Sequence, residues 1–226
     1  VSQAVTVGTY GKYSGVPTGH DVSSNDAFKD SSRPAITSTT PTYWMRASEV
    51  YFLLAEAALH GFAVGGTAES LYEKGIEMSF EENGIASSEG ADYMSSGLKP
   101  SAYSFHLTNP SVNVDAPALT QATTEWTGTD EEKLEKIMIQ KWIALYPNGQ
   151  EAWTEYRRTG YPKLHSTITN YSNGEVDSEV GIRRMRFPTN KSTSAEDIAN
   201  LESARKLLRG GLDKAGTRLW WDNKNH

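Results

Sequence analysis

The sequence predicts an all-α fold built from pairs of helices joined by short turns. Three observations predict it: segments in which apolar residues recur every three or four positions, residues that can cap a helix at the start of those segments, and glycines or prolines that end them. Two segments show all three features, at residues 44–84 and 130–164. Each is long enough for a hairpin of two helices, the unit that stacks side by side in helical-repeat proteins.

The first hairpin begins abruptly at Trp44, after a long stretch without helical periodicity. Its first helix is expected to end at Gly61, and its second helix to begin after Thr67 and end at Gly84. Gly75 falls on the inner side of the second helix, where its cost of about 1 kcal/mol in helix propensity is offset if another helix approaches closely. The face of the first helix that is predicted to be buried consists of Ala47, Val50, Tyr51, Leu54, Ala57 and Ala58.

The second hairpin carries the clearest start and stop signals. Thr129 and Glu132 have the spacing of a capping box, in which each side chain satisfies a backbone N–H at the start of a helix. Pro147 ends that helix, and Asn148 is placed to cap the next one, which is expected to end near Gly160. A corner this short predicts that the two helices are antiparallel neighbours.

The remaining segments are assigned by composition. Residues 1–43 form a loop-rich lead-in, and residues 86–128 form a variable loop region rich in Ser, Thr, Pro and Asn. Residues 165–226 hold loops, a last helix that opens at Ser194, and the apolar tail at 217–222, which is expected to dock on the body. The stripe of the last helix that is predicted to be buried consists of Ile198, Leu201, Ala204, Arg205 and Leu208.

Composition excludes several classes of function. The formal charge of −6 and the pI near 5.4 argue against nucleic acid as a partner. The absence of cysteine excludes disulfides, thiolate metal sites and a cysteine nucleophile. No apolar run reaches the roughly 20 residues that cross a bilayer. Because the sequence starts at Val1 with neither an initiator methionine nor a leader, we expect it to be a piece of a longer protein.

No catalytic or metal-binding motif is present, and no cofactor is predicted. The histidines are too scattered for a helical metal site; they are His20, His60, His106, His165 and His226. A cluster of carboxylates at residues 130–135 lies in the first turn of a helix, where the helix dipole favours negative charge. Capping is therefore favoured over catalysis for this cluster, because paired acid and base groups normally come from facing elements.

Arginines and aromatic residues supply the remaining candidates. The arginines could bind an anion, but acidic neighbours favour ion pairs that fasten segments together; they are Arg157, Arg158, Arg183, Arg184 and Arg186. Aromatic residues at helical spacing are predicted to be core; they are Tyr51, Tyr72, Trp142 and Trp153. Aromatic residues in loops are candidates for stacking on a sugar face, with burial as an equal alternative; they are Tyr10, Tyr13, Tyr93, Tyr103 and Trp126.

Five segments also carry a resemblance to a known family. They are WMRASEVYFLLAEAALHG at 44–61, LYEKGIEMSFEENG at 71–84, QKWIALYPNGQEAWTEYRRTGYP at 140–162, RRMRFP at 183–188 and GTRLWWD at 216–222. In this order they resemble the C-terminal half of a SusD/RagB-type outer-membrane nutrient-binding lipoprotein. Residues 1–43 and 86–128 match that family only in their position as variable loops. The matched motif residues that we interpret as architectural are Trp142, Trp153, Arg157, Arg158 and Pro162.

The resemblance implies a fold of tetratricopeptide-like hairpins, with residues 1–226 as the C-terminal part of a single domain. It implies capture of a glycan or another nutrient oligomer on the outer face of a Bacteroidetes-type outer membrane. It also implies a lipid anchor on an N-terminal cysteine that this chain lacks, and two partners: the N-terminal half of the same protein and a SusC-type TonB-dependent transporter. No ligand residue of the family can be transferred, because the known ligand surfaces lie on absent parts or on variable loops.

Three functions remain open from the sequence. Non-enzymatic binding of a glycan leads, because motif order and the missing catalytic groups both favour it. A protein-interaction scaffold without affinity for sugar is the alternative. A helical glycosidase or lyase would require two carboxylates facing each other across a cleft, and the least badly placed residues are Glu81, Glu82 and Asp92.

Overall fold

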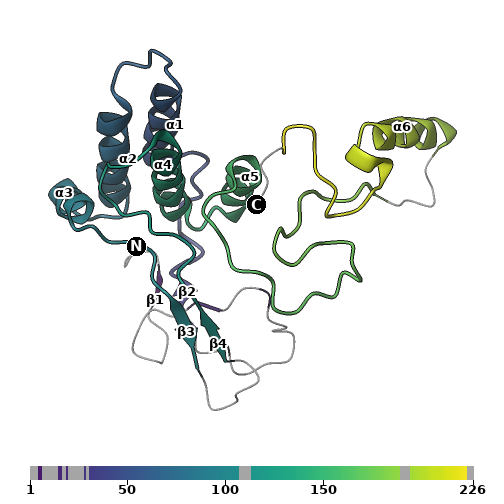
Figure 1. Ribbon diagram of the computed structural model, residues 1–226, viewed down its shortest axis with the longest axis horizontal. Coiled ribbons are helices and arrows are strands. Elements are labelled where there is room, and N and C mark those ends of the chain that lie inside the picture. The colour runs from purple at the N-terminus through teal and green to yellow at the C-terminus, as the bar shows by residue number, and fades with distance from the viewer. Residues whose placement is uncertain are drawn as a thin grey trace.

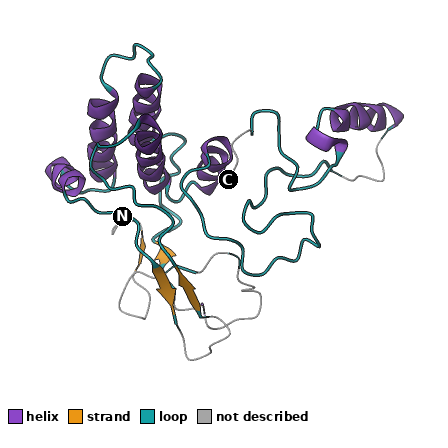
Figure 2. Ribbon diagram, viewed as in Figure 1, coloured by secondary structure: helices purple, strands orange, loops and turns teal. Residues whose placement is uncertain are grey.

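The computed structural model describes residues 5–6, 15–16, 19, 28, 31–106, 113–188 and 194–222. The helices are α1 (Ala47–Leu59), α2 (Ala68–Glu82), α3 (Ser87–Ser95), α4 (Asp130–Leu145), α5 (Gly149–Thr159) and α6 (Ala195–Lys206), with a 3-10 turn at Arg209–Gly211. The strands are β1 (Val5–Thr6), β2 (Arg33–Pro34), β3 (Tyr103–Phe105) and β4 (Val114–Ala116). Helices dominate and the strands are two or three residues long, so the prediction of an all-α fold is confirmed (Figure 2).

The helices α1, α2 and α4 lie side by side and form the body of the molecule, with α3 packed against α2 (Figure 1). The side chains between them form the main hydrophobic core. Its buried members are Phe52 and Ala55 from α1, Leu71, Tyr72 and Ile76 from α2, and Leu134, Ile137, Met138 and Ala144 from α4. The two predicted hairpins are therefore present and pack on one another through α1 and α4.

Gly75 lets α1 and α2 approach closely. A β-carbon added at Gly75 would lie 2.7 Å from Cε1 of Phe52, a distance that real side chains do not tolerate. The aromatic ring of Phe52 thus occupies the space that any other residue would fill. The predicted close approach at this glycine is confirmed.

The buried face of α1 differs from the predicted one. The buried residues are Ser48, Glu49, Phe52, Ala55 and Glu56. Ala47 and Val50, which the sequence assigned to the core, are exposed, and the other members of the predicted face are half-buried. The prediction was wrong because α1 is apolar on nearly every side, so periodicity does not identify which side faces the core.

The predicted helix ends are confirmed at residue level. Glu132 Oε2 accepts a hydrogen bond of 2.7 Å from the backbone N–H of Thr129, whose hydroxyl accepts from Glu132 N–H in return. Asn148 Oδ1 caps α5 by accepting from the N–H of Glu151, and Gly160 ends α5 with a positive φ of 79°. The turn chemistry of this hairpin was therefore readable from local sequence.

The region 86–128 has more structure than its composition predicts. It contains α3 and an antiparallel hairpin in which Tyr103 pairs with Ala116 and Phe105 with Val114. Lys136 on α4 holds the end of this region, because its ammonium donates to the carbonyl of Glu125 and to two threonine hydroxyls. The three-residue strands were too short to show a period of two in the sequence.

Residues 165–188 and 194–222 belong to an arm that extends away from the helical body and carries α6 at its far end (Figure 1). Its capping box at Ser194 is present, as predicted. The predicted stripe is only partly buried: Leu208, just beyond the helix, is buried, Ile198 is exposed, and the other three members are half-buried. None of the described helices is long and apolar enough to cross a membrane.

The end of the tail docks as expected. Asp222 is fully buried, and Arg183 Nε donates a hydrogen bond of 2.7 Å to its carboxylate. Trp221 is half-buried with Arg157 5.0 Å from its ring, whereas Trp220 is 78% exposed. The tail is thus attached through an ion pair rather than through both tryptophans.

Candidate functional site

The structure places Tyr93 on α3 and Tyr103 on β3, so the prediction that these two aromatic residues lie in loops is wrong. The described members of this candidate set lie in two separate clusters. Tyr93 and Trp126 pack against the main helical core, whereas Tyr103 belongs to a second cluster with Phe28 and Phe105. All three candidate rings are half-buried. Tyr10 and Tyr13 lie outside the described residues. The structure therefore does not join the described candidates into one cluster, and their role in binding remains a prediction.

Tyr103 fastens the β3–β4 hairpin to the lead-in. Its hydroxyl donates a hydrogen bond of 2.9 Å to the carbonyl of Gly15. Its ring stacks on Phe105 with centroids 6.5 Å apart, and Phe105 in turn stacks on Phe28 at 5.6 Å. This arrangement brings the hairpin beside Gly15, which follows Tyr13 by two positions in the sequence.

Tyr93 lines a hollow of about 290 Å³ between α3, α4 and the segment that follows β4, which we call the Tyr93 hollow. The Tyr93 hydroxyl lies 3.2 Å from the side-chain amide of Gln140, and its ring packs 5.6 Å from that of Phe80. Burial raises the pKa of Tyr93, so the hydroxyl stays protonated. Lys99 and Thr123 add an ammonium and a hydroxyl to the same lining. A ring bordered by amide, hydroxyl and ammonium groups suits a polyhydroxylated ligand.

A second hollow of about 570 Å³ adjoins the Tyr93 hollow, and we call it the Lys163 hollow. The two hollows share Ala122, Thr123 and Lys136 in their linings. Its charged lining consists of Glu125, Glu132, Glu135, Lys136 and Lys163. Trp126 is adjacent in sequence to this lining, with its ring 5.0 Å from Tyr72 and 5.7 Å from the Lys133 ammonium.

A third hollow, of about 540 Å³, lies at the start of α1, and we call it the Trp44 hollow. Trp44 is 95% exposed and Tyr43 is 55% exposed, with the guanidinium of Arg46 4.5 Å from the Tyr43 ring. Glu82 closes the inner side, where the backbone N–H and the hydroxyl of Ser48 both donate to its carboxylate. This surface was not predicted from the sequence, although the adjacent aromatic pair in front of a helix start was a signal for it.

Glu49 is the buried acid of the Trp44 hollow. Burial raises the pKa of its carboxyl above the usual value of 4.5, although the Lys141 ammonium acts in the opposite direction. Glu82, one of the acids considered for catalysis, is already bound by Ser48 and lies 3.8 Å from Arg46. Its carboxylate therefore links α1 to α2. Among the described residues, no group of three or more acidic or histidine side chains is arranged to hold a metal ion.

The arginines of α5 tie elements together. Arg158 donates to both carboxylate oxygens of Glu56 on α1, at 2.6 and 2.7 Å, and also to Glu155. Arg157 lies 3.6 Å from the ring centroid of Trp153, whose indole N–H donates to the carbonyl of Ile182 in the arm. These contacts support the interpretation that the arginines fasten segments. Trp142 and Trp153 are half-buried, and Pro162 follows a cis peptide bond.

A protein-family model matches nearly the whole of this chain. That family is described as SusD-like, "Susd and RagB outer membrane lipoprotein", and the match covers residues 2–222. The chain belongs to the SusD-like family. The resemblance drawn from the five motifs is thereby confirmed.

Solved structures of SusD homologues have the same fold. A chitin-binding SusD homologue from Flavobacterium johnsoniae is 39% identical, with a TM-score of 0.84, and the match covers 99% of this chain and 46% of that chain. A SusD-like protein from Bacteroides thetaiotaomicron is 33% identical with a TM-score of 0.88, over 99% of this chain and 47% of that chain. A homologue from Bacteroides vulgatus is 36% identical with a TM-score of 0.85, over 99% and 46%.

This SusD-like chain thus spans about half the length of the structures that it matches. No curated protein matches it.

Proposed function

We propose that this SusD-like protein binds a glycan at the bacterial cell surface and leaves it chemically unchanged. The observation that carries the proposal is the 39% identity to a chitin-binding SusD homologue over 99% of this chain. A likeness that extends over the whole chain includes the loop regions as well as the helical frame. Oligosaccharides of N-acetylglucosamine are therefore the first ligands to test.

The candidate aromatic residues supply side chains that can stack on sugar rings. Sugar rings present apolar faces that stack on aromatic side chains, and their hydroxyl groups need hydrogen-bonding partners at the rim. The Tyr93 hollow offers a ring beside Gln140, Lys99 and Thr123. Tyr103 donates a hydrogen bond to Gly15, in the same sequence segment as Tyr10 and Tyr13. We propose these rings, together with Trp126, as the glycan contacts.

Binding without turnover is supported by how the acidic residues are used. Glu132 caps α4, Glu82 accepts two hydrogen bonds from Ser48, and Glu131 accepts from the hydroxyl of Tyr161. Carboxylates engaged in this way stabilise helix ends and helix contacts, whereas a glycosidase needs two of them free on either side of the scissile bond.

We further propose the setting that the family description suggests. A SusD-like outer membrane lipoprotein would carry its lipid on a cysteine outside this chain, face the exterior, and pass its ligand to a SusC-type TonB-dependent transporter. The N-terminal half of the same protein would be the second partner. These proposals follow from family membership and not from any contact seen here.

Isothermal titration calorimetry tests the proposed function. The chain is titrated with N-acetylchitohexaose, maltohexaose, cellohexaose and a mannan oligosaccharide. After each titration, the solution in the calorimeter cell is analysed by chromatography for cleavage products. Saturable binding of one of these glycans with no product is the expected result. Heat of binding below detection for every glycan at millimolar concentration would reject glycan binding, and any cleavage product would reject a passive binder.

The protein-interaction scaffold remains the second candidate, because α1 presents an exposed apolar face that no sugar requires. Retention of a SusC-type transporter by the immobilised protein, combined with no heat in any glycan titration, would favour that function.

A further inference from the structure

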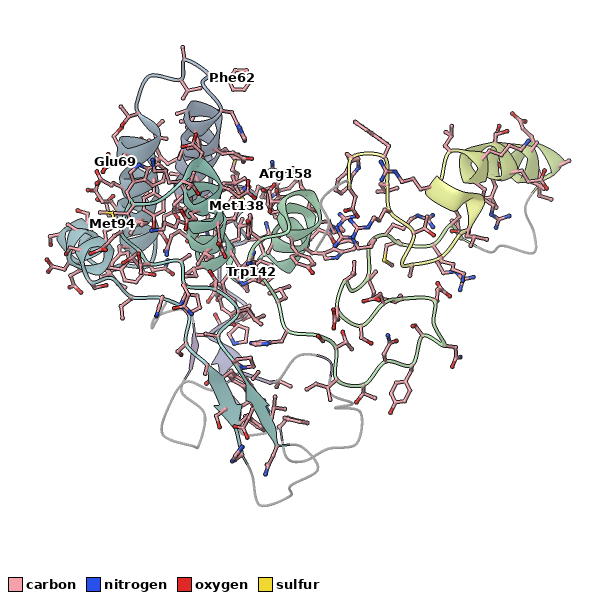
Figure 3. All side chains as sticks on the ribbon, in the orientation of Figure 1. Phe62, Glu69, Met94, Met138, Trp142 and Arg158 are labelled. Atoms are coloured by element: carbon pink, nitrogen blue, oxygen red, sulfur yellow. The ribbon has the colours of Figure 1, made fainter. Side chains whose placement is uncertain are left out.

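The lining of the Lys163 hollow includes a buried carboxylate, that of Glu135. This residue lies on α4, three positions before the core residue Met138 that is labelled in Figure 3. Glu135 is 8% exposed, and its Oε1 atom is buried with no hydrogen-bond partner among the described residues. Buried carboxylates are normally paired or hydrogen-bonded, because otherwise they lose their hydration without compensation. This oxygen therefore points to a donor that comes from a ligand.

Two proton donors close enough to interact electrostatically with Glu135 are committed to other acceptors. The Lys136 ammonium donates to a backbone carbonyl at 2.6 Å and to two threonine hydroxyls at 3.2 Å, which uses all three of its protons. The Tyr161 hydroxyl donates to Glu131 at 2.9 Å. Burial and this hydrogen bond raise the pKa of Tyr161 to about 12, and the charge of Glu135 adds to the rise. Neither residue has a second proton to give to Glu135.

The charges around the hollow favour a cationic ligand. Three carboxylates, from Glu125, Glu132 and Glu135, face two ammonium groups, from Lys136 and Lys163. Hydrogen bonds from the helix cap lower the pKa of Glu132, so this carboxylate stays ionised. Lys163 is exposed, so water weakens its attraction for these acids. A sugar that carries sulfate or carboxylate groups is therefore disfavoured here, and a positively charged sugar is favoured.

The position of the Lys163 hollow suits one unit of an oligosaccharide. Its volume of about 570 Å³ lies within the range of about 300–1,000 Å³ that is usual for small-molecule sites. Because it shares Ala122, Thr123 and Lys136 with the Tyr93 hollow, a chain of sugars that stacks on Tyr93 can extend into it. The group on a sugar that is both cationic and a hydrogen-bond donor is a protonated amine.

We propose that the Lys163 hollow is a subsite for an amino sugar, whose protonated amine donates a hydrogen bond to Glu135. The carboxylate of Glu135 turns toward the hollow to accept this bond. A neutral acetamide or hydroxyl group can also donate to a carboxylate, but it leaves the negative charge of the buried acid uncompensated. The inference rests on the proposed glycan binding and adds to it the class of sugar and the residue that selects it.

Calorimetry with three matched glycans tests the proposal. Glucosamine hexaose, N-acetylchitohexaose and cellohexaose share one backbone and differ only in one substituent on each ring, which is an amine, an acetamide or a hydroxyl group. The full chain is titrated at mildly acidic pH, so that the free amine is protonated. The test variant, Glu135→Gln, removes the charge and keeps the shape of the side chain. The control, Glu202→Gln, removes the same charge from an exposed position on α6.

The wild-type chain and Glu202→Gln are expected to bind glucosamine hexaose about tenfold more tightly than cellohexaose, because a hydrogen bond between charged groups contributes about that factor. In Glu135→Gln the two affinities are expected to differ by less than about twofold. N-acetylchitohexaose is expected to bind all three forms equally, since its acetamide is neutral. The melting temperature of Glu135→Gln should lie no more than about 3 °C below that of wild type, because the charge that it removes has no partner.

Equal affinity of the wild-type chain for glucosamine hexaose and cellohexaose would overturn the proposal and leave glycan binding intact. A preference for the amine that persists in Glu135→Gln would also overturn it. So would a preference that falls equally in Glu202→Gln, because the overall negative charge of the chain would then be its cause. A larger fall in the melting temperature of Glu135→Gln would show that the carboxylate stabilises the fold through a partner of its own, which again overturns the proposal.

The same titrations separate this proposal from the proposed function. If none of the three matched glycans binds but maltohexaose or the mannan oligosaccharide does, the amino-sugar subsite is rejected and glycan binding stands. If no glycan of either set binds, the proposed function is rejected together with the subsite.

Discussion

Arg157 and Arg183 each donate a hydrogen bond to the other's backbone carbonyl: Arg157 Nη1 to the carbonyl of Arg183 at 2.8 Å, and Arg183 Nη2 to the carbonyl of Arg157 at 2.9 Å. This exchange joins α5 of the helical body to the start of the arm. Both side chains are buried, and the negative charge that accompanies them is that of Asp222 at the end of the tail. Two cationic residues and one acid thus connect three segments that are far apart in sequence.

Replacing Asp222 with Ala should be strongly destabilising. The substitution leaves the guanidinium of Arg183 buried without its counter-charge, and breaking a buried pair in this way costs about 3–5 kcal/mol. Urea unfolding followed by circular dichroism measures the loss. The control is Trp220→Ala, two residues away and 78% exposed, for which a change of no more than about 0.5 kcal/mol is expected. Equal effects of the two substitutions would contradict the buried ion pair.

Gly75→Ala should destabilise the contact between α1 and α2. The added methyl group would lie 2.7 Å from the Phe52 ring, and relieving such a clash in a packed core costs about 1–3 kcal/mol. Gly149→Ala at the start of α5 is the matched control, because the added methyl group meets nothing within 4 Å. Thermal melts of both variants measure the difference. A Gly75→Ala protein as stable as wild type would show that Phe52 does not pack on α2 in this way.

The capping box of α4 should make stability depend on pH. The N–H and the hydroxyl of Thr129 donate to Glu132 and lower its pKa below the usual value of 4.5. An acid whose pKa is lower in the folded state stabilises the protein above its unfolded pKa, and this stabilisation is lost as the pH falls through the folded value. Glu132→Gln should therefore lower the melting temperature at pH 7 and cease to do so at pH 2.5. A melting difference that is the same at both pH values would argue against the charged cap.

Arg158→Lys should weaken the link between α5 and α1. A lysine ammonium cannot donate to both oxygens of Glu56 and to Glu155 with the geometry of a guanidinium. The Arg158 side chain is 39% exposed, so the loss is expected to be about 1–2 kcal/mol rather than the cost of a fully buried pair. Arg186→Lys, which affects an exposed pair with Glu175 at 3.5 Å, is the control and should be neutral in the same urea titration. If both substitutions leave the free energy of unfolding unchanged, Arg158 does not have the structural role assigned to it.

The parts of the fold that were predictable from sequence are those set by neighbouring residues. Thr129, Asn148 and Gly160 mark helix ends through contacts within a few positions, so their chemistry is visible in the sequence. The core face of α1 was not predictable, because apolar residues occupy almost every side and the choice depends on the distant partners Glu82 and Arg158. The strands β3 and β4 escaped prediction because they are only three residues long.

The candidate site was harder to predict than the fold. The segments assigned to loops showed no helical or strand periodicity of apolar residues, so the candidate binding residues in them were chosen by residue type alone. Tyr93 is half-buried because of contacts with Phe80 and Gln140 that lie far along the chain, and Tyr103 is held by Gly15. The aromatic pair at Tyr43 and Trp44 was visible in the sequence, but its exposure depends on which distant segments pack against it. Motif order was the strongest signal, because several separate segments matched one family together.

If the helical frame displays aromatic side chains to a glycan that it does not alter, the bound glycan must remain intact and must contact those side chains. A crystal structure of the protein soaked with N-acetylchitohexaose tests it most directly. We expect electron density for an intact oligosaccharide whose sugar rings contact one or more of the candidate aromatic residues, which are Tyr10, Tyr13, Tyr93, Tyr103 and Trp126. An oligosaccharide bound away from all of these aromatic residues, or a cleaved chain held between two carboxylates, would contradict this expectation.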